Sequence, residues 1–133
     1  VLSNSKVLSE KYKVDNPVDS AVIPVMIWNK LVELYDPDVW IWEREQQAIK
    51  LACEELEGTF SCWAHNTDTG NVYLIRNGST LFANKKTGGF SSAQAPCMES
   101  LDDHAIYRVF YDVEDDIIEK VGHFNTSSPF FIL

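Results

Sequence analysis

The chain has 133 residues, a net charge of −9 and an apolar fraction of 45%. This length and composition predict one packed domain and exclude a disordered chain. The acidic excess argues against nucleic acid as a partner, because nucleic-acid binders concentrate Lys and Arg to displace counterions from phosphates. A membrane is not an expected partner either, since no apolar run approaches the ~18 residues of a membrane span.

A first helix is predicted at residues 5–12, where apolar side chains follow helical spacing. Asn4 or Ser5 offers a cap for this helix. The run at 15–17, which contains Pro17, then interrupts the chain.

Two longer helices are predicted to follow. Asp19 or Ser20 can cap the first of them, and Pro24 predicts a kink or a shifted start. The other spans roughly 43–56, with Gly58 near its C-terminal end. The two apolar stripes consist of Ile23, Met26, Ile27, Leu31 and Leu34 in the first helix, and of Ile49, Ala52, Cys53 and Leu56 in the second.

The chain changes character at Gly58, after which strands and turns are predicted. Residues 60–65 alternate between apolar and polar side chains, which is typical of a half-buried strand. Further strands are expected at 72–75, 81–83 and 105–111, with turns at 66–71 and 76–79, and residues 115–123 fit either a strand or a turn of helix. The sequence therefore predicts one α+β domain over 1–133, mainly helical over 1–57 and mainly strands over 58–133.

Several short motifs occur in an order that resembles class II glutamine amidotransferases, which are N-terminal-nucleophile hydrolases. The family pattern "G-x-[FY]-[AS]" is matched by GTFS at 58–61, "ARNGSPL" by IRNGSTL at 75–81, and an "SSE"-like strand by FSSA at 90–93. Upstream, VLSN at 1–4 is similar to "I-I-x-N", and VDSAVI at 18–23 is similar to "T-D-[ST]-E-V-I". The resemblance covers the chain to about Arg108.

The resemblance implies αββα layers of antiparallel sheets and packed helices, present here as an incomplete domain. In the family, an N-terminal cysteine attacks the side-chain amide of glutamine, and a His-Asn-Gly motif supplies the oxyanion hole. Both would lie upstream of Val1, so no catalytic residue is expected in this chain and it should be inactive alone. The implied partners are glutamine as substrate, a missing N-terminal segment or partner chain, and a synthase domain or protein that receives the ammonia.

Asp19 is the one substrate-binding residue that the resemblance implies. It matches the aspartate of "T-D-[ST]-E", which accepts a hydrogen bond from the α-ammonium group of the substrate. A purely structural interpretation remains open, in which Asp19 only caps the helix that follows. Ala21 stands where the family has Glu, so the capping-box partner is lost.

No cofactor or metal is expected. His65, His104 and His123 are too dispersed for a metal site. The three cysteines are odd in number and lack CxxC spacing, which predicts reduced thiols and a cytoplasmic location. Cys53 and Cys62 are expected to be buried, and Cys97 to be exposed.

The second hypothesis is a catalytically inactive relative that acts as a binding or inhibitory module. This hypothesis is favoured by the acidic charge of the chain, by Ala21 in place of Glu and by Pro24. The four tryptophans suggest either an aromatic stacking face or, more in keeping with their positions, packing in a core or domain interface: Trp28, Trp40, Trp42 and Trp63.

Overall fold

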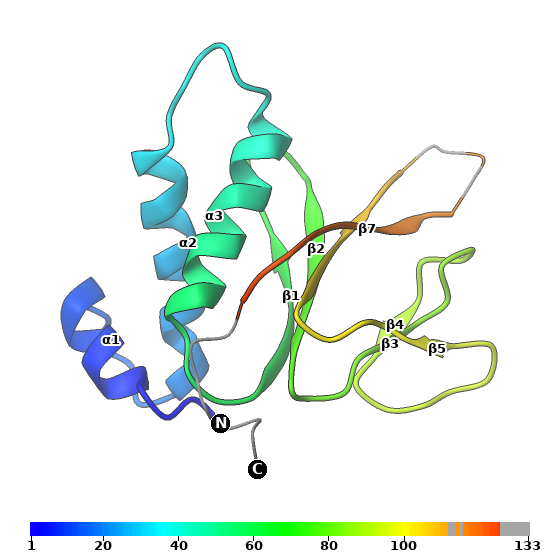
Figure 1. Ribbon diagram of the computed structural model, residues 1–133, viewed down its shortest axis with the longest axis horizontal. Helices are drawn as coiled ribbons and strands as arrows, with labels where there is room; N and C mark the ends of the chain where they lie inside the picture. The colour runs from blue at the N-terminus through cyan, green and yellow to red at the C-terminus, as the bar shows by residue number, and fades with distance from the viewer. Residues whose placement is uncertain (112–113, 115, 126–133) are drawn as a thin grey trace. The chain divides into compact units, whose positions relative to one another are not determined.

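The computed structural model describes residues 1–111, 114 and 116–125, and these fall into two compact units (Figure 1). The first unit contains residues 1–59 together with Phe124 and Asn125, and the second is Phe60–His123. Helices occupy the first unit and antiparallel strands the second. The α+β class predicted from the sequence is confirmed, and the change of character predicted at Gly58 lies beside the boundary between the units.

The first unit is built on two neighbouring helices, α2 and α3 (Figure 1). Its elements are α1 (Ser5–Tyr12), the short 3₁₀ helix η1 (Asp19–Ala21), α2 (Val22–Glu33) and α3 (Ile41–Glu55). The predicted stripe of α3 is fully buried, which explains why a helix with many charged residues is stable here. In α2 the buried side chains are Val22, Ile23, Met26 and Leu31.

Pro24 lies in the first turn of α2, so the shifted start predicted for this helix is confirmed. A proline is tolerated there because the first N–H groups of a helix have no partner within the helix. The capping prediction is wrong for both Asp19 and Ser20. They belong to η1, whereas Ala21 precedes α2, and neither helix has a side-chain hydrogen bond at its N-cap.

The second unit contains a four-stranded antiparallel sheet in the order β1-β2-β6-β7. Its strands are β1 (Phe60–His65), β2 (Val72–Asn77), β6 (Ala105–Val109) and β7 (Ile118–His123). The stretch that fitted either strand or helix is therefore a strand from Ile118 onward, while residue 115 lies outside the described part. The turn predicted at 76–79 begins later than expected, because β2 continues to Asn77.

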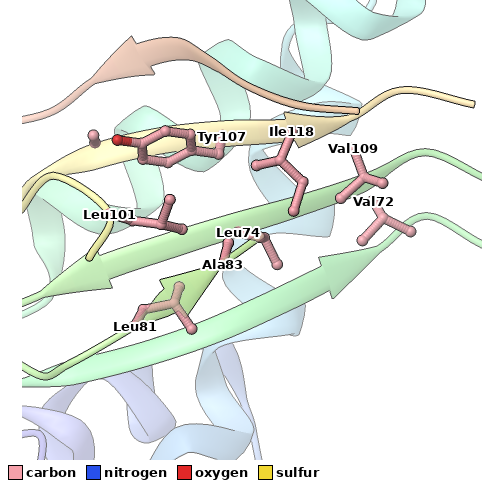
Figure 2. Packing of buried hydrophobic residues seen from close by; sticks show 9 residues of the cluster. Val72, Leu74, Leu81, Ala83, Leu101, Tyr107, Val109 and Ile118 are labelled. Carbon is pink, nitrogen blue, oxygen red and sulfur yellow. The ribbon is translucent and has the colours of Figure 1, made fainter. Parts of the chain in front are cut away.

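A small sheet in the order β4-β3-β5 shares a hydrophobic core with the larger one. Its strands are β3 (Phe82–Ala83), β4 (Phe90–Ser91) and β5 (Glu99–Ser100). Figure 2 shows Leu74 and Tyr107 of the large sheet gathered with Ala83 of the small one. The cluster comprises Val72, Leu74, Leu81, Ala83, Leu101, Ala105, Tyr107, Val109 and Ile118. This core holds the second unit together without a disulfide, because all three cysteines are free.

Within the described residues, no helix combines the length and the apolar character that crossing a bilayer requires.

Candidate functional site

Three segments that are distant in the sequence meet in the first unit, at Leu2. The first residues of the chain pair antiparallel with the segment after α3: Leu2 forms a β-bridge with Gly58, and Val1 and Thr59 exchange two backbone hydrogen bonds of 2.7 and 3.0 Å. The backbone N–H of Leu2 also donates to Oδ2 of Asp19 at 2.8 Å. The residues that match "I-I-x-N", "T-D-[ST]-E" and "G-x-[FY]-[AS]" thus lie together.

The pairing at Leu2 requires glycine at position 58. Gly58 has φ +119°, a conformation that side-chain-bearing residues rarely adopt. A Cβ atom there would lie 2.2 Å from the carbonyl oxygen of Val1 and 2.9 Å from Cα of Leu2. The absence of a side chain at Gly58 therefore permits the close approach of the two backbones.

Asp19 holds a negative charge at this meeting point. The hydrogen bond from the N–H of Leu2 lowers the pKa of its carboxyl group below the ordinary value of 3.8. Its side chain is ionised at neutral pH and is only partly buried. Backbone N–H groups of Ser20 and of Asp19 itself contribute to the same lowering of the pKa. This is the position of the one substrate-binding residue expected from the sequence.

The side chain of Asn4 connects the start of the chain to the backbone that follows α3. Asn4 or Ser5 was expected to cap α1; Asn4 does occupy the N-cap position, but its side chain makes no capping bond. Instead its Nδ2 donates to the carbonyl oxygen of Glu55 at 2.8 Å, and its Oδ1 accepts the N–H of Glu57 at 3.0 Å. Asn4 thereby satisfies backbone groups at the end of α3, where carbonyls lack helical partners. In the sequence, only the match to "I-I-x-N" had singled out Asn4.

Glu55 ties the three α-helices of the first unit together. Its carboxylate accepts hydrogen bonds from Nζ of Lys11 at 2.6 Å and from the hydroxyl of Tyr12 at 2.7 Å, and it pairs with Nζ of Lys30 at 2.8 Å. Partial burial alone would raise the pKa of Glu55, but these three partners outweigh it and lower the pKa to about 2. No sequence pattern indicated this cluster, because its members come from three separate helices, α1, α2 and α3.

The three cysteines differ in their surroundings. Cys53 is fully buried in α3, as expected. Burial raises the pKa of the Cys62 thiol to about 12, so this thiol is protonated at neutral pH. Cys97 is exposed, as expected.

Arg76 stabilises the turn that follows β2. Its Nε donates to the carbonyl oxygen of Ser79, and its guanidinium also donates to the carbonyl oxygen of Leu101. Across the same turn, the N–H of Gly78 donates to Oδ1 of Asp103 at 2.8 Å. These bonds from Arg76 and Gly78 close a loop within the second unit.

The four tryptophans were expected to pack in a core or in a domain interface; three of them do not lie in a core, and the interface alternative stays a prediction. Trp28, Trp40 and Trp63 expose 53%, 70% and 58% of their surface, and only Trp42 is half-buried. Trp28 lies on α2 away from the buried stripe, and Trp40 is the N-cap residue of α3. In the second unit, the indole of Trp63 stacks on His65 and contacts Phe90.

Residues able to hold a metal ion do not gather in the described part of the chain, where no group of three or more His, Cys, Asp or Glu side chains forms a site. Comparison of the sequence with protein-family models and with curated proteins found no match. The functional interpretation therefore depends on the residues around Leu2, Asp19 and Gly58.

Proposed function

We propose that this chain is the part of a glutamine amidotransferase domain that lies downstream of its nucleophile. The supporting observation is the convergence at Leu2: its N–H donates to Asp19, and its backbone pairs with Gly58. Three of the motifs behind the resemblance occur in segments that contact one another, as parts of one binding site would. The finer fold that accompanies the proposal is the αββα arrangement of N-terminal-nucleophile hydrolases.

In this proposal Asp19 binds the substrate rather than transforming it. Its carboxylate accepts a hydrogen bond from the α-ammonium group of glutamine, and such a charge-assisted bond is stronger than a neutral one. The thiolate of an N-terminal cysteine, supplied by an upstream segment or a partner chain, attacks the side-chain amide. Ammonia leaves toward a synthase partner, and water hydrolyses the thioester to glutamate.

Glutamate release tests this proposal. The coding region is expressed with its native upstream sequence, and glutamate formation from glutamine is followed with and without the glutamine analogue DON. We expect glutamate release that DON abolishes, and no release from the 133-residue chain alone. An upstream region without a cysteine that can become N-terminal, or a complete chain without glutaminase activity, would end the enzyme proposal.

The exposed aromatic side chains favour a second candidate, an inactive relative that binds another protein. Trp28, Tyr35 and Trp40 are all more than half exposed in the first unit, and aromatic residues are enriched where proteins bind each other. The net charge of −9 suits a basic partner. A pull-down at low and high salt tests this candidate: a partner retained by the wild type and lost in Trp28→Ala supports it, and equal retention by both opposes it.

A further inference from the structure

The helix α2 is apolar on the side that faces solvent as well as on its buried side. Its polar residues are Asn29, Lys30 and Glu33. The side-chain amide of Asn29 donates to the carbonyl oxygen of Val25 in the same helix, and Lys30 pairs with Glu55 of α3. A helix that is apolar on all sides normally has all of its sides buried. The exposed side of α2 therefore differs from an ordinary solvated helix face.

The exposed apolar side chains of α2 follow one another at a regular spacing. Trp28 and Val32 leave 53% and 58% of their surface exposed, and Val25 is half-buried. Tyr35 is 71% exposed and continues the row, because its N–H donates to the carbonyl oxygen of Val32 at 3.2 Å. The steps from Val25 to Tyr35 are three, four and three residues, which is the spacing of the seam between two packed helices. We call these residues the α2 seam: Val25, Trp28, Val32 and Tyr35.

The connection after α2 joins this seam to the start of α3. The two helices lie side by side and are linked by residues 34–40 (Figure 1). The guanidinium of Arg44 lies 5.3 Å from the centre of the Tyr35 ring. One turn before Arg44, the carbonyl oxygen of Trp40 accepts its N–H at 3.3 Å, and the Trp40 side chain is 70% exposed. The exposed aromatic surface of the first unit thus extends from α2 to the first turn of α3.

The surroundings of this end of the seam are acidic. Between residues 24 and 44 the cationic side chains are Lys30 and Arg44. Glu55 binds the first, and the second lies against Tyr35. The exposed carboxylates between the last turn of α2 and the first turn of α3 are Glu33, Asp36, Asp38 and Glu43. The carbonyl groups at the C-terminal end of α2 add a partial negative charge, so this end of the seam attracts cations.

We propose that the α2 seam is the docking site of a basic amphipathic helix of a partner protein, laid along α2. The inference rests on the second candidate function, a binding module, and does not depend on glutaminase activity. The seam spacing matches the apolar positions of a helix and not the alternation of an extended strand. Lys or Arg side chains that flank the apolar row of the partner then lie beside Glu33 and Asp36.

A second copy of this chain suits the seam less well than a basic helix. Two copies, each with a net charge of −9, repel each other. The stretch that carries the seam offers a second copy no unengaged cation, because Glu55 holds Lys30 and Tyr35 covers Arg44. The charge of the site therefore selects a basic partner.

Peptide binding to the 133-residue chain tests the proposal. The probe is a synthetic helix of about 21 residues, with Leu at the a and d positions and Lys at the e and g positions, where repulsion keeps the peptide from pairing with itself. One control peptide has the same composition in scrambled order, and another has Glu in place of Lys. Titration calorimetry should show the Lys helix binding at least roughly 10-fold more tightly than the scrambled peptide, and the Glu helix not binding.

Two matched pairs of variants locate the binding on the seam. Val32→Ser should weaken binding of the Lys helix roughly 10-fold, whereas Val7→Ser, at a similarly exposed valine of α1, should leave it unchanged. Glu33→Gln should weaken it roughly 3–10-fold at low salt and less at high salt, whereas Glu10→Gln on α1 should not. Because all four side chains are exposed, these variants should keep the fold, which circular dichroism checks.

Tryptophan emission provides a second readout of the same contact. The Lys helix should shift the emission of the wild type to shorter wavelength, because an exposed indole becomes buried. The shift should be reduced in Trp28→Phe. It should persist in Trp63→Phe, which removes a similarly exposed indole from β1.

Equal binding of the Lys helix and the scrambled peptide, or equal affinity of Val32→Ser and the wild type, would overturn the proposal. Self-association of the chain that Val32→Ser abolishes would also overturn it, because a second copy would then occupy the seam. A partner retained through Trp28 in the pull-down, without any preference for the Lys helix, would keep the second candidate function and remove the helix. Absence of glutamate release would remove the first proposed function alone.

Discussion

The backbone N–H of Leu2 donates a hydrogen bond to the carboxylate of Asp19 at 2.8 Å, across 17 positions of the sequence. This bond lowers the pKa of Asp19 and fixes a negative charge beside the pairing of Leu2 with Gly58. A carboxylate that was interpreted as either a helix cap or a substrate ligand is thus tied to a different segment altogether.

The close approach at Gly58 predicts a large cost for a side chain there. In Gly58→Ala the new Cβ atom would meet the carbonyl oxygen of Val1 at 2.2 Å, and the residue would keep φ +119°. Because both strain and overpacking apply, we expect a loss of about 3 kcal/mol or more in the free energy of unfolding. Urea unfolding followed by circular dichroism measures it.

Gly70→Ala is the matched control for that loss. Gly70 also has positive φ, +80°, but a Cβ atom there meets nothing within 4 Å. Only the conformational cost remains, about 1 kcal/mol. Equal losses in the free energy of unfolding of the two variants would show that the close approach of Val1 to Gly58 adds no cost for a side chain at position 58.

The Glu55 cluster predicts a pH-dependent stability. The pKa of Glu55 is lowered from 4.5 to about 2, so its contribution is fully present above about pH 4.5 and is lost as the pH falls toward 2. After allowance for solvent screening, we expect Glu55→Gln to lower the free energy of unfolding by about 1–2 kcal/mol at pH 7. The gap to the wild type should close between about pH 4.5 and 2, as urea titrations at several pH values would measure.

Glu43→Gln provides the control on the same helix. Glu43 is exposed in the first turn of α3, so its replacement should change stability by less than about 0.5 kcal/mol. High salt should reduce the difference in free energy of unfolding between the wild type and Glu55→Gln, because the ion pairs of Glu55 with Lys11 and Lys30 are partly exposed. A Glu55→Gln deficit that persists unchanged at pH 2 would contradict the ionic explanation.

Thiol labelling should distinguish the three cysteines. At pH 7.5 iodoacetamide should modify Cys97 quickly and leave the buried Cys53 and the protonated, high-pKa Cys62 unlabelled until the protein unfolds. Peptide mass spectrometry identifies the site, and Cys97→Ser should abolish labelling of the folded protein. Rapid native labelling of Cys62 would show that its thiol is more accessible and more acidic than described.

The helices were predictable because each is long enough for its apolar periodicity to be recognised. The segment at 5–12 matches α1, and the predicted stripe of α3 is buried as a whole. The strand at 60–65 was predictable from its alternation. By contrast, β5 has only two exposed residues, Glu99 and Ser100, and it exists as a strand through its pairing with β3.

The site was only partly predictable. Asp19 could be selected through the resemblance, but its partner Leu2 could not, since no local pattern encodes a bond between a backbone N–H and a distant carboxylate. The network around Glu55 was missed for the same reason. Composition could not decide between a core and an interface for the tryptophans, because aromatic residues favour burial on average, whereas the exposure of Trp28 depends on the orientation of α2.

The KM for glutamine of an Asp19→Asn variant tests the central claim most directly. It is measured by glutamate release in the chain with its native upstream sequence, beside Asp15→Asn as an exposed control in the preceding loop. Loss of a charge-assisted hydrogen bond to the α-ammonium group predicts a KM raised roughly 10–100-fold in Asp19→Asn, with Asp15→Asn unchanged. An unchanged KM in Asp19→Asn would contradict the assignment of Asp19 to glutamine.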